Sequence, residues 1–276
     1  MDLCAGFDGP HPHHVDLRLP PAARPTVSRQ AHHRPALDAV HASWHGRRPH
    51  RHRRVAPLAR RVVSAFVDIP SPGWPLTFGE AGNPSIVIIH DRFGRLPYLE
   101  SYATALASRG FFVVVPDLFN GLATIDAPSA DELRDAMDLG FALATLDDAI
   151  ALGRNGTSKV GIIGFEIGGW LALQAAQAGS ADAVVSYAGG LTENEPGILP
   201  CPVLLNYSDL GDWGTGTEAD LFVSRLKEMG TPVTRHTYVG TNDIFANATL
   251  VERLDKNAAA LAFARSTNFL QEQLVD

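Results

Sequence analysis

The stretch Lys159-Val-Gly-Ile-Ile-Gly-Phe-Glu-Ile-Gly-Gly-Trp-Leu171 joins an apolar run to a segment with helical spacing. Glycines stand two residues before and two residues after Glu166, and small residues at these places permit a tight strand-to-helix turn. Such a turn lifts the central side chain clear of the sheet edge, beside helix N–H groups that favour an anion. The pattern predicts a nucleophile elbow in which Glu166 stands where serine or cysteine is usual.

Apolar runs and helical segments alternate on both sides of this turn. Strands are predicted at residues 86–89, 111–115, 159–163, 183–187, 203–207 and 233–239. Helices are predicted at residues 98–109, 129–152, 168–177, 217–229 and 257–273. This alternation predicts an α/β fold with a doubly wound, mostly parallel sheet and helices on both faces. Functional groups in such sheets lie just beyond the carboxyl ends of the strands.

The first 61 residues differ in composition from the rest of the chain. They hold 11 of the 23 Lys and Arg residues and nine of the 11 histidines, but only four acidic residues. Because their apolar residues follow neither a strand nor a helix period, we predict a disordered extension at 1–61 and a domain at 62–276. The favoured explanation of this composition is translation upstream of the true start or out of frame. Two other interpretations stay open: nucleic-acid or lipid contact by the run Arg47–Arg54, and metal binding by histidine pairs.

Charge and hydropathy exclude several classes of function for the domain. By difference, residues 62–276 carry 12 basic and 26 acidic side chains, which argues against nucleic-acid binding. No apolar run reaches the roughly 20 residues that a membrane span needs. Two cysteines cannot form a disulfide framework, and no signal-peptide pattern is present. These features predict a cytoplasmic protein without nucleic-acid or membrane partners, and no pattern calls for a cofactor.

Several ordered motifs resemble those of the dienelactone hydrolase (carboxymethylenebutenolidase-like) family of the α/β-hydrolase superfamily. The matching motifs are His90-Asp-Arg-Phe-Gly94, Val113-Val-Val-Pro-Asp-Leu-Phe119, Gly164-Phe-Glu-Ile-Gly-Gly169, Cys201-Pro-Val-Leu-Leu205 and Tyr238-Val-Gly-Thr-Asn-Asp-Ile-Phe-Ala-Asn247. The resemblance covers about residues 66–275. It implies the α/β-hydrolase fold, action on small lactones or carboxylic esters, and a catalytic triad of cysteine, histidine and aspartate.

The chain departs from that family at the positions that carry the chemistry. Glu166 falls on the nucleophile, and Asp243 falls on the histidine. The aspartate position falls on Gly211, with Asp212 and Asp209 as neighbours. We therefore expect the standard triad to be absent, and we take Glu166, Asp243, Asp212 and Asp91 as the candidate catalytic side chains; Asp91 stands where the family has glutamate.

Other parts of the expected site depend less on side-chain identity. The backbone N–H groups of Arg92 and Ile167 would form the oxyanion hole, which any residue can supply. His90 and Arg95 are candidates for substrate binding, although a structural hydrogen-bonding role for His90 is the favoured alternative. The resemblance implies no metal.

The acidic site leaves several functions open. The favoured interpretation is weak or lost lactone and ester hydrolysis, because the Glu166 carboxylate can occupy the oxyanion hole itself. The rivals are a hydrolase in which Glu166 attacks as a carboxylate nucleophile, acid–base chemistry between two carboxylates, a divalent metal site, and a small-ligand-binding protein without turnover.

Overall fold

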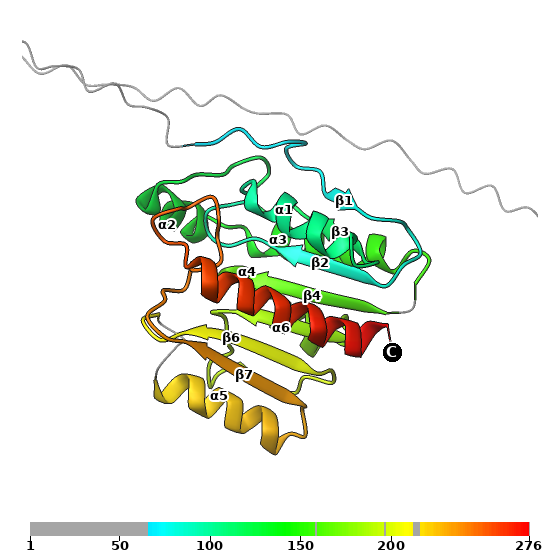
Figure 1. The fold of residues 1–276 in the computed structure, drawn as a ribbon, viewed down its shortest axis with the longest axis vertical. Helices are drawn as coiled ribbons and strands as arrows, with labels where there is room; N and C mark the ends of the chain where they lie inside the picture. Colours follow the sequence, from blue (N-terminus) through cyan, green and yellow to red (C-terminus); the bar gives the residue numbers. More distant parts are fainter. Residues whose placement is uncertain (1–65, 158, 196, 212–215, 276) are drawn as a thin grey trace, which may run out of the picture. The chain divides into compact units, whose positions relative to one another are not determined.

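The computed structural model describes residues 66–157, 159–195, 197–211 and 216–275. The predictions made for residues 1–61, the domain boundary at residue 62 and the candidate Asp212 lie outside these ranges. Within them the chain forms a seven-stranded sheet in the order β1-β3-β2-β4-β5-β6-β7 (Figure 1). The strands are β1 (Leu76–Phe78), β2 (Ser85–Ile89), β3 (Phe112–Val115), β4 (Val160–Phe165), β5 (Ala183–Tyr187), β6 (Val203–Ser208) and β7 (Val233–Tyr238).

All neighbouring strands run parallel except β1, which pairs antiparallel with β3. Every residue of β2, β3, β4, β5 and β6 is buried, which accounts for their nearly continuous apolar sequences. The edge strand β7 is partly exposed, and its four central residues, 234–237, are all polar. The mostly parallel sheet predicted from the sequence is confirmed.

Helices cover both faces of the sheet. The helices are α1 (Tyr98–Ala107), α2 (Ala127–Asp135), α3 (Leu139–Arg154), α4 (Ile167–Gln177), α5 (Thr217–Glu228) and α6 (Lys256–Leu274). Side chains of α3, α4 and α5 join Val87 and Ile89 in one apolar cluster. Side chains of α1 and α6 join Ile86 and Ile88 in the other, and α6 is the red helix that crosses the sheet in Figure 1. Successive residues of β2 therefore pack alternately into the two apolar clusters, one on each face of the sheet.

One local prediction was wrong, and one strand was missed. The single helix expected at 129–152 is divided into α2 and α3, because Asp138 accepts a hydrogen bond from the Phe141 N–H group and caps a new helix. The short strand β1 was not predicted, since only three half-exposed residues form it. The remaining elements end within one or two residues of the predicted bounds, and no described helix is long and apolar enough to span a membrane.

Candidate active site at the elbow

The turn between β4 and α4 has the strained backbone that the two glycines predict. Glu166 has φ 52° and ψ −110°, a conformation that non-glycine residues rarely adopt. A Cβ atom at Gly164 would lie 2.0 Å from the Gly168 carbonyl oxygen, and one at Gly168 would lie 2.5 Å from the His90 carbonyl oxygen. The Glu166 N–H group donates to the Tyr187 carbonyl at 2.7 Å. The turn thus holds Glu166 at the carboxyl edge of the sheet.

The Glu166 carboxylate binds Arg92 in two ways. Its Oε2 atom accepts a hydrogen bond from the Arg92 backbone N–H group at 3.2 Å, and its Oε1 atom pairs with the Arg92 guanidinium. Both side chains are mostly buried, with 16% and 17% exposed. The structure therefore places the carboxylate on one of the two N–H groups expected to form the oxyanion hole. Ile167, which carries the other, begins α4 and lines the cavity described below.

Arg92 also connects the elbow to α2. Its Nε atom lies 3.1 Å from Asp131, which in turn pairs with Arg134 at 3.2 Å. Burial raises the pKa of Glu166, and the charge of Arg92 and its hydrogen bonds offset only part of that rise. Glu166 and Asp131 thus hold Arg92 between them, so the elbow side chain belongs to a chain of ion pairs that reaches α2.

Asp91 lies behind this ion pair and is almost completely buried. It accepts hydrogen bonds from the Phe93 N–H group at 2.9 Å, from the Tyr98 hydroxyl at 3.2 Å and from Asn247 at 2.9 Å. Burial, followed by the negative charge of Glu166, raises the pKa of Asp91 to about 7. Its three donors fix the orientation of the Asp91 side chain, whether it is ionised or protonated.

Ionisation of Asp91 is expected to lower stability as pH rises. Its folded pKa of about 7 exceeds the usual 3.8, so the stabilisation is complete below about pH 3.8 and is lost as pH approaches 7. We expect the free energy of unfolding of Asp91→Asn, measured against the unmodified chain, to improve by a few kcal/mol between about pH 4 and 7 and then to stay level. Urea denaturation across this range measures it, and a difference independent of pH would contradict the assignment.

Asp243 occupies the space that a side chain at position 211 would need. A Cβ atom at Gly211 would lie 1.7 Å from the Asp243 Oδ1 atom and 2.3 Å from the Ser208 hydroxyl. Ser208, at the end of β6, donates its hydroxyl hydrogen to Asp243. The carboxylate of Asp243 has therefore taken the place of an aspartate side chain at 211. Asp209 instead accepts from the Gly240 N–H group at 2.7 Å and holds the loop after β7.

A cavity of about 340 Å³ opens beside the elbow. Six of the residues that line it contribute to its chemistry: Arg134, Glu166, Ile167, Trp170, Glu195 and Asp243. Sequence motifs pointed to Glu166, Ile167 and Asp243, but not to Arg134 or Glu195, which lie on α2 and on the loop after β5. No motif separates such residues from ordinary surface charges.

Glu195 is held in the cavity wall by neutral donors. Its Oε1 atom accepts from the Trp170 indole and from Gln174, each at 2.6 Å, and its Oε2 atom accepts from Thr192. Partial burial would raise the pKa of Glu195, but the bonds from Thr192 and Trp170 lower it overall. Within the part of the chain that the structure describes, no group of three or more acidic, His or Cys side chains could hold a metal ion.

The two side chains expected to bind substrate lie elsewhere. His90 is completely buried, and its Nε2 atom accepts from the Leu118 N–H group at 3.1 Å. Its Nδ1 atom therefore carries the hydrogen and donates to the Asp91 carbonyl at 2.8 Å. Burial lowers the pKa of His90 to about 4, so the ring stays neutral. Both ring nitrogens of His90 thus bond to the backbone, which agrees with a structural role and does not agree with substrate binding.

Arg95 is also buried, with 2% of its surface exposed. Its guanidinium donates to the backbone carbonyls of Trp74, Val115, Ser71 and Pro70. A substrate-binding role for Arg95 does not agree with these contacts, because all of these bonds tie it to the chain segments around β1 and β3.

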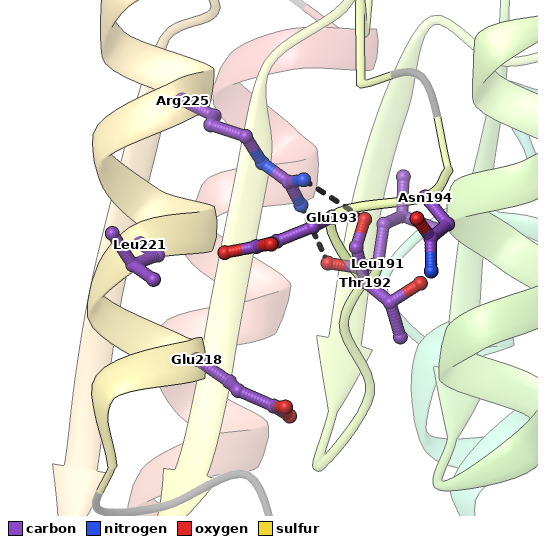
Figure 2. Close-up of a pocket in the computed structure, with 7 residues that line it drawn as sticks. All are labelled: Leu191, Thr192, Glu193, Asn194, Glu218, Leu221 and Arg225. Atoms are coloured by element: carbon purple, nitrogen blue, oxygen red, sulfur yellow. Dashed lines mark hydrogen bonds between the residues drawn. The ribbon is translucent and has the colours of Figure 1, made fainter.

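A second cavity of about 290 Å³ lies between α5 and the loop after β5 (Figure 2). Thr192 lines both cavities. Figure 2 shows Arg225, on α5, donating to the carbonyl oxygens of Leu191 at 2.6 Å and Thr192 at 2.8 Å. The side chains of Glu193 and Glu218 border this cavity from the loop and from the helix.

A family model described as the dienelactone hydrolase family matches residues 76–274. The chain belongs to this family. A putative carboxymethylenebutenolidase of Azospirillum brasilense is 26% identical over 228 residues, which cover 76% of the chain and 94% of the relative. Carboxymethylenebutenolidases of Rhodococcus opacus and Pseudomonas putida are 31% and 30% identical, but the matches span only 38% and 52% of those relatives and 34% and 40% of this chain.

Solved structures of this family share the fold. A dienelactone-hydrolase-like promiscuous phosphotriesterase from metagenomic libraries superposes with a TM-score of 0.62 at 19% identity, covering 71% of this chain and 88% of that one. A putative dienelactone hydrolase of Klebsiella pneumoniae gives a TM-score of 0.59 at 21% identity, covering 73% and 95%. Together with the sheet order, these likenesses establish the α/β-hydrolase fold.

Proposed function

We propose that this member of the dienelactone hydrolase family keeps a cavity for a small lactone- or ester-like ligand but has lost ordinary ester hydrolysis. The observation that carries the proposal is the position of the Glu166 carboxylate on the Arg92 N–H group. An acyl oxygen would need that N–H group in the transition state, and losing one oxyanion donor slows acyl transfer by roughly 100- to 1,000-fold. The carboxylate of the elbow residue therefore competes with the reaction that the fold supports.

The contacts of Glu166 also argue against its acting as a nucleophile. Its Oε1 atom is paired with the Arg92 guanidinium, which lowers the electron density available for attack. An ester formed on Glu166 would then need a base to activate water, and Asp243 stands where the family has its histidine. His90 is buried and fully engaged in backbone contacts. These features favour lost hydrolysis over carboxylate-nucleophile chemistry.

Hydrolysis assays test the proposal directly. With dienelactone and p-nitrophenyl acetate, we expect the full-length chain to show no turnover above buffer, and Glu166→Ala to be equally inactive. The matched control is Glu80→Gln, an exposed carboxylate in the turn before β2. Turnover in the unmodified chain that survives in Glu80→Gln and disappears in Glu166→Ala would make Glu166 a working catalytic group and refute the proposal.

Two predictions from the sequence are retained as part of this proposal. They are the separation of residues 1–61 from the hydrolase-like domain and a cytoplasmic location. The small ligand is assigned to the elbow cavity because this cavity contains the elbow residue and lies at the carboxyl edge of the sheet.

A further inference from the structure

The wall of the elbow cavity carries more negative than positive charge. Three of its lining side chains are carboxylates, those of Glu166, Glu195 and Asp243, and one, Arg134, is a guanidinium. A carboxylate-bearing ligand would be repelled by such a wall unless an arginine were available to pair with it. The nearby arginines therefore decide which charge a ligand can carry.

Each arginine at this cavity is already paired with carboxylates of the protein. Arg92 pairs with Glu166 and with Asp131. Arg134 pairs with Asp131 at 3.2 Å and with Asp135 at 3.0 Å. An anionic ligand would have to displace one of these carboxylates to gain an ion pair, so the cavity offers little net attraction to an anion.

Glu195 has the opposite property, because its negative charge is held in place without a cation. Its hydrogen-bond partners are the Trp170 indole, the Gln174 amide and Thr192, all of them neutral groups. These bonds keep the side chain ionised and fix its position in the wall. Trp170 is half-buried and lines the same cavity, so an aromatic side chain stands beside the fixed carboxylate. Fixed carboxylates and aromatic rings are the groups that recognise organic cations.

The neighbouring cavity extends this acidic character. It shares Thr192 with the elbow cavity, and Figure 2 shows Glu193 and Glu218 at its border. Arg225 also lines this cavity, and because its two carbonyl partners are neutral, its positive charge offsets only one of these two carboxylates. Carboxylates therefore outnumber arginines in the lining of both cavities.

We propose that the elbow cavity binds a small organic cation, an ammonium or amidinium compound with an apolar body, in preference to a carboxylate-bearing lactone. Glu195, whose oxygens already accept four hydrogen bonds, would attract the cationic group through its charge, and the Trp170 side chain would contact the apolar body. This inference rests on the proposed function only in assigning the ligand to the elbow cavity. It names a class of ligand that differs in charge from a carboxymethyl-bearing compound.

Thermal unfolding with three ligands of similar size tests the charge preference. Benzylamine is a cation at neutral pH, benzyl alcohol is uncharged and benzoate is an anion. We expect benzylamine to raise the melting temperature of the full-length chain in a dose-dependent way, and the other two to shift it much less. Raising the sodium chloride concentration should weaken the benzylamine effect, because ions screen the pairing with Glu195.

Two variants locate the effect. Glu195→Gln is expected to reduce the apparent affinity for benzylamine about tenfold, as the loss of a charge-assisted contact predicts. Glu80→Gln removes an exposed carboxylate beyond the opposite edge of the sheet and should leave the affinity unchanged. Calorimetric titration gives the affinities, and the melting temperature without ligand shows that each variant is folded.

Two results would overturn the inference: benzoate binding at least as tightly as benzylamine, or equal benzylamine affinity in Glu195→Gln and the unmodified chain. Failure of the proposed function looks different, because it shows as Glu166-dependent ester turnover. The charge preference can hold or fail independently of that assay.

Discussion

Exchanging three residues together is expected to turn this chain into an esterase. In the variant Glu166→Cys, Gly211→Asp, Asp243→His, the elbow regains a thiol, and the family's histidine and aspartate return to their positions. Removing Glu166 also uncovers the Arg92 N–H group for an acyl oxygen. We expect hydrolysis of p-nitrophenyl acetate to rise at least about 100-fold over the unmodified chain, the effect of restoring an oxyanion donor and an activated nucleophile.

The three changes are expected to depend on one another. With Asp243 in place, a Cβ atom at position 211 would lie 1.7 Å from its Oδ1 atom, so Gly211→Asp alone should destabilise the fold. Asp243→His removes the Oδ1 atom, but the Cγ atom at position 243 lies 2.2 Å from this Cβ atom and the Ser208 hydroxyl lies 2.3 Å from it. Both belong to side chains, so rotation of the new histidine and of Ser208 has to open the space for the Cβ atom at position 211. Glu166→Cys alone lacks a base and should gain far less activity. A triple variant that melts near the unmodified chain yet stays inactive would show that the site has lost more than these residues.

The fold was predictable from the sequence where a strand is buried on both faces, because such a strand consists almost entirely of apolar residues. Strand β4 and the glycines around Glu166 illustrate this, because a steric requirement at Gly164 and Gly168 forces the residue type. The break between α2 and α3 was missed because apolar spacing continues across it, and only the capping aspartate Asp138 marks the boundary. Helical periodicity reports the buried face and says little about where one helix ends.

Site residues were predictable from the sequence only where they follow the carboxyl end of a predicted strand. Glu166 and Asp243 follow β4 and β7, so their convergence on one cavity follows from the parallel sheet. Ser208 and Glu195 were missed, because a hydroxyl or a loop carboxylate gains its role from partners distant in sequence. The contacts of Arg95 were missed for a related reason: its partners are backbone carbonyls, which every residue possesses, so no pattern reveals them.

Replacing Arg95 is expected to cause a large loss of stability. Arg95→Met keeps much of the side-chain length but removes every donor from the carbonyls of Trp74, Val115, Ser71 and Pro70. A buried acceptor left without a partner costs about 1–3 kcal/mol, and water can reach some of these groups after the change. We therefore expect the free energy of unfolding to fall by about 4 kcal/mol, measured by urea denaturation.

Arg109→Met is the matched control, because Arg109 is exposed and donates to the Ala105 carbonyl within its own helical turn. Loss of that exposed bond should cost about 1 kcal/mol or less. Arg95→Lys is expected to fall between the two, since an ammonium is a single point donor and cannot reach carbonyls on both β1 and β3 sides as a planar guanidinium does. If Arg95→Met stays within about 1 kcal/mol of the unmodified chain, Arg95 does not hold these segments together, and its burial would need another physical cause.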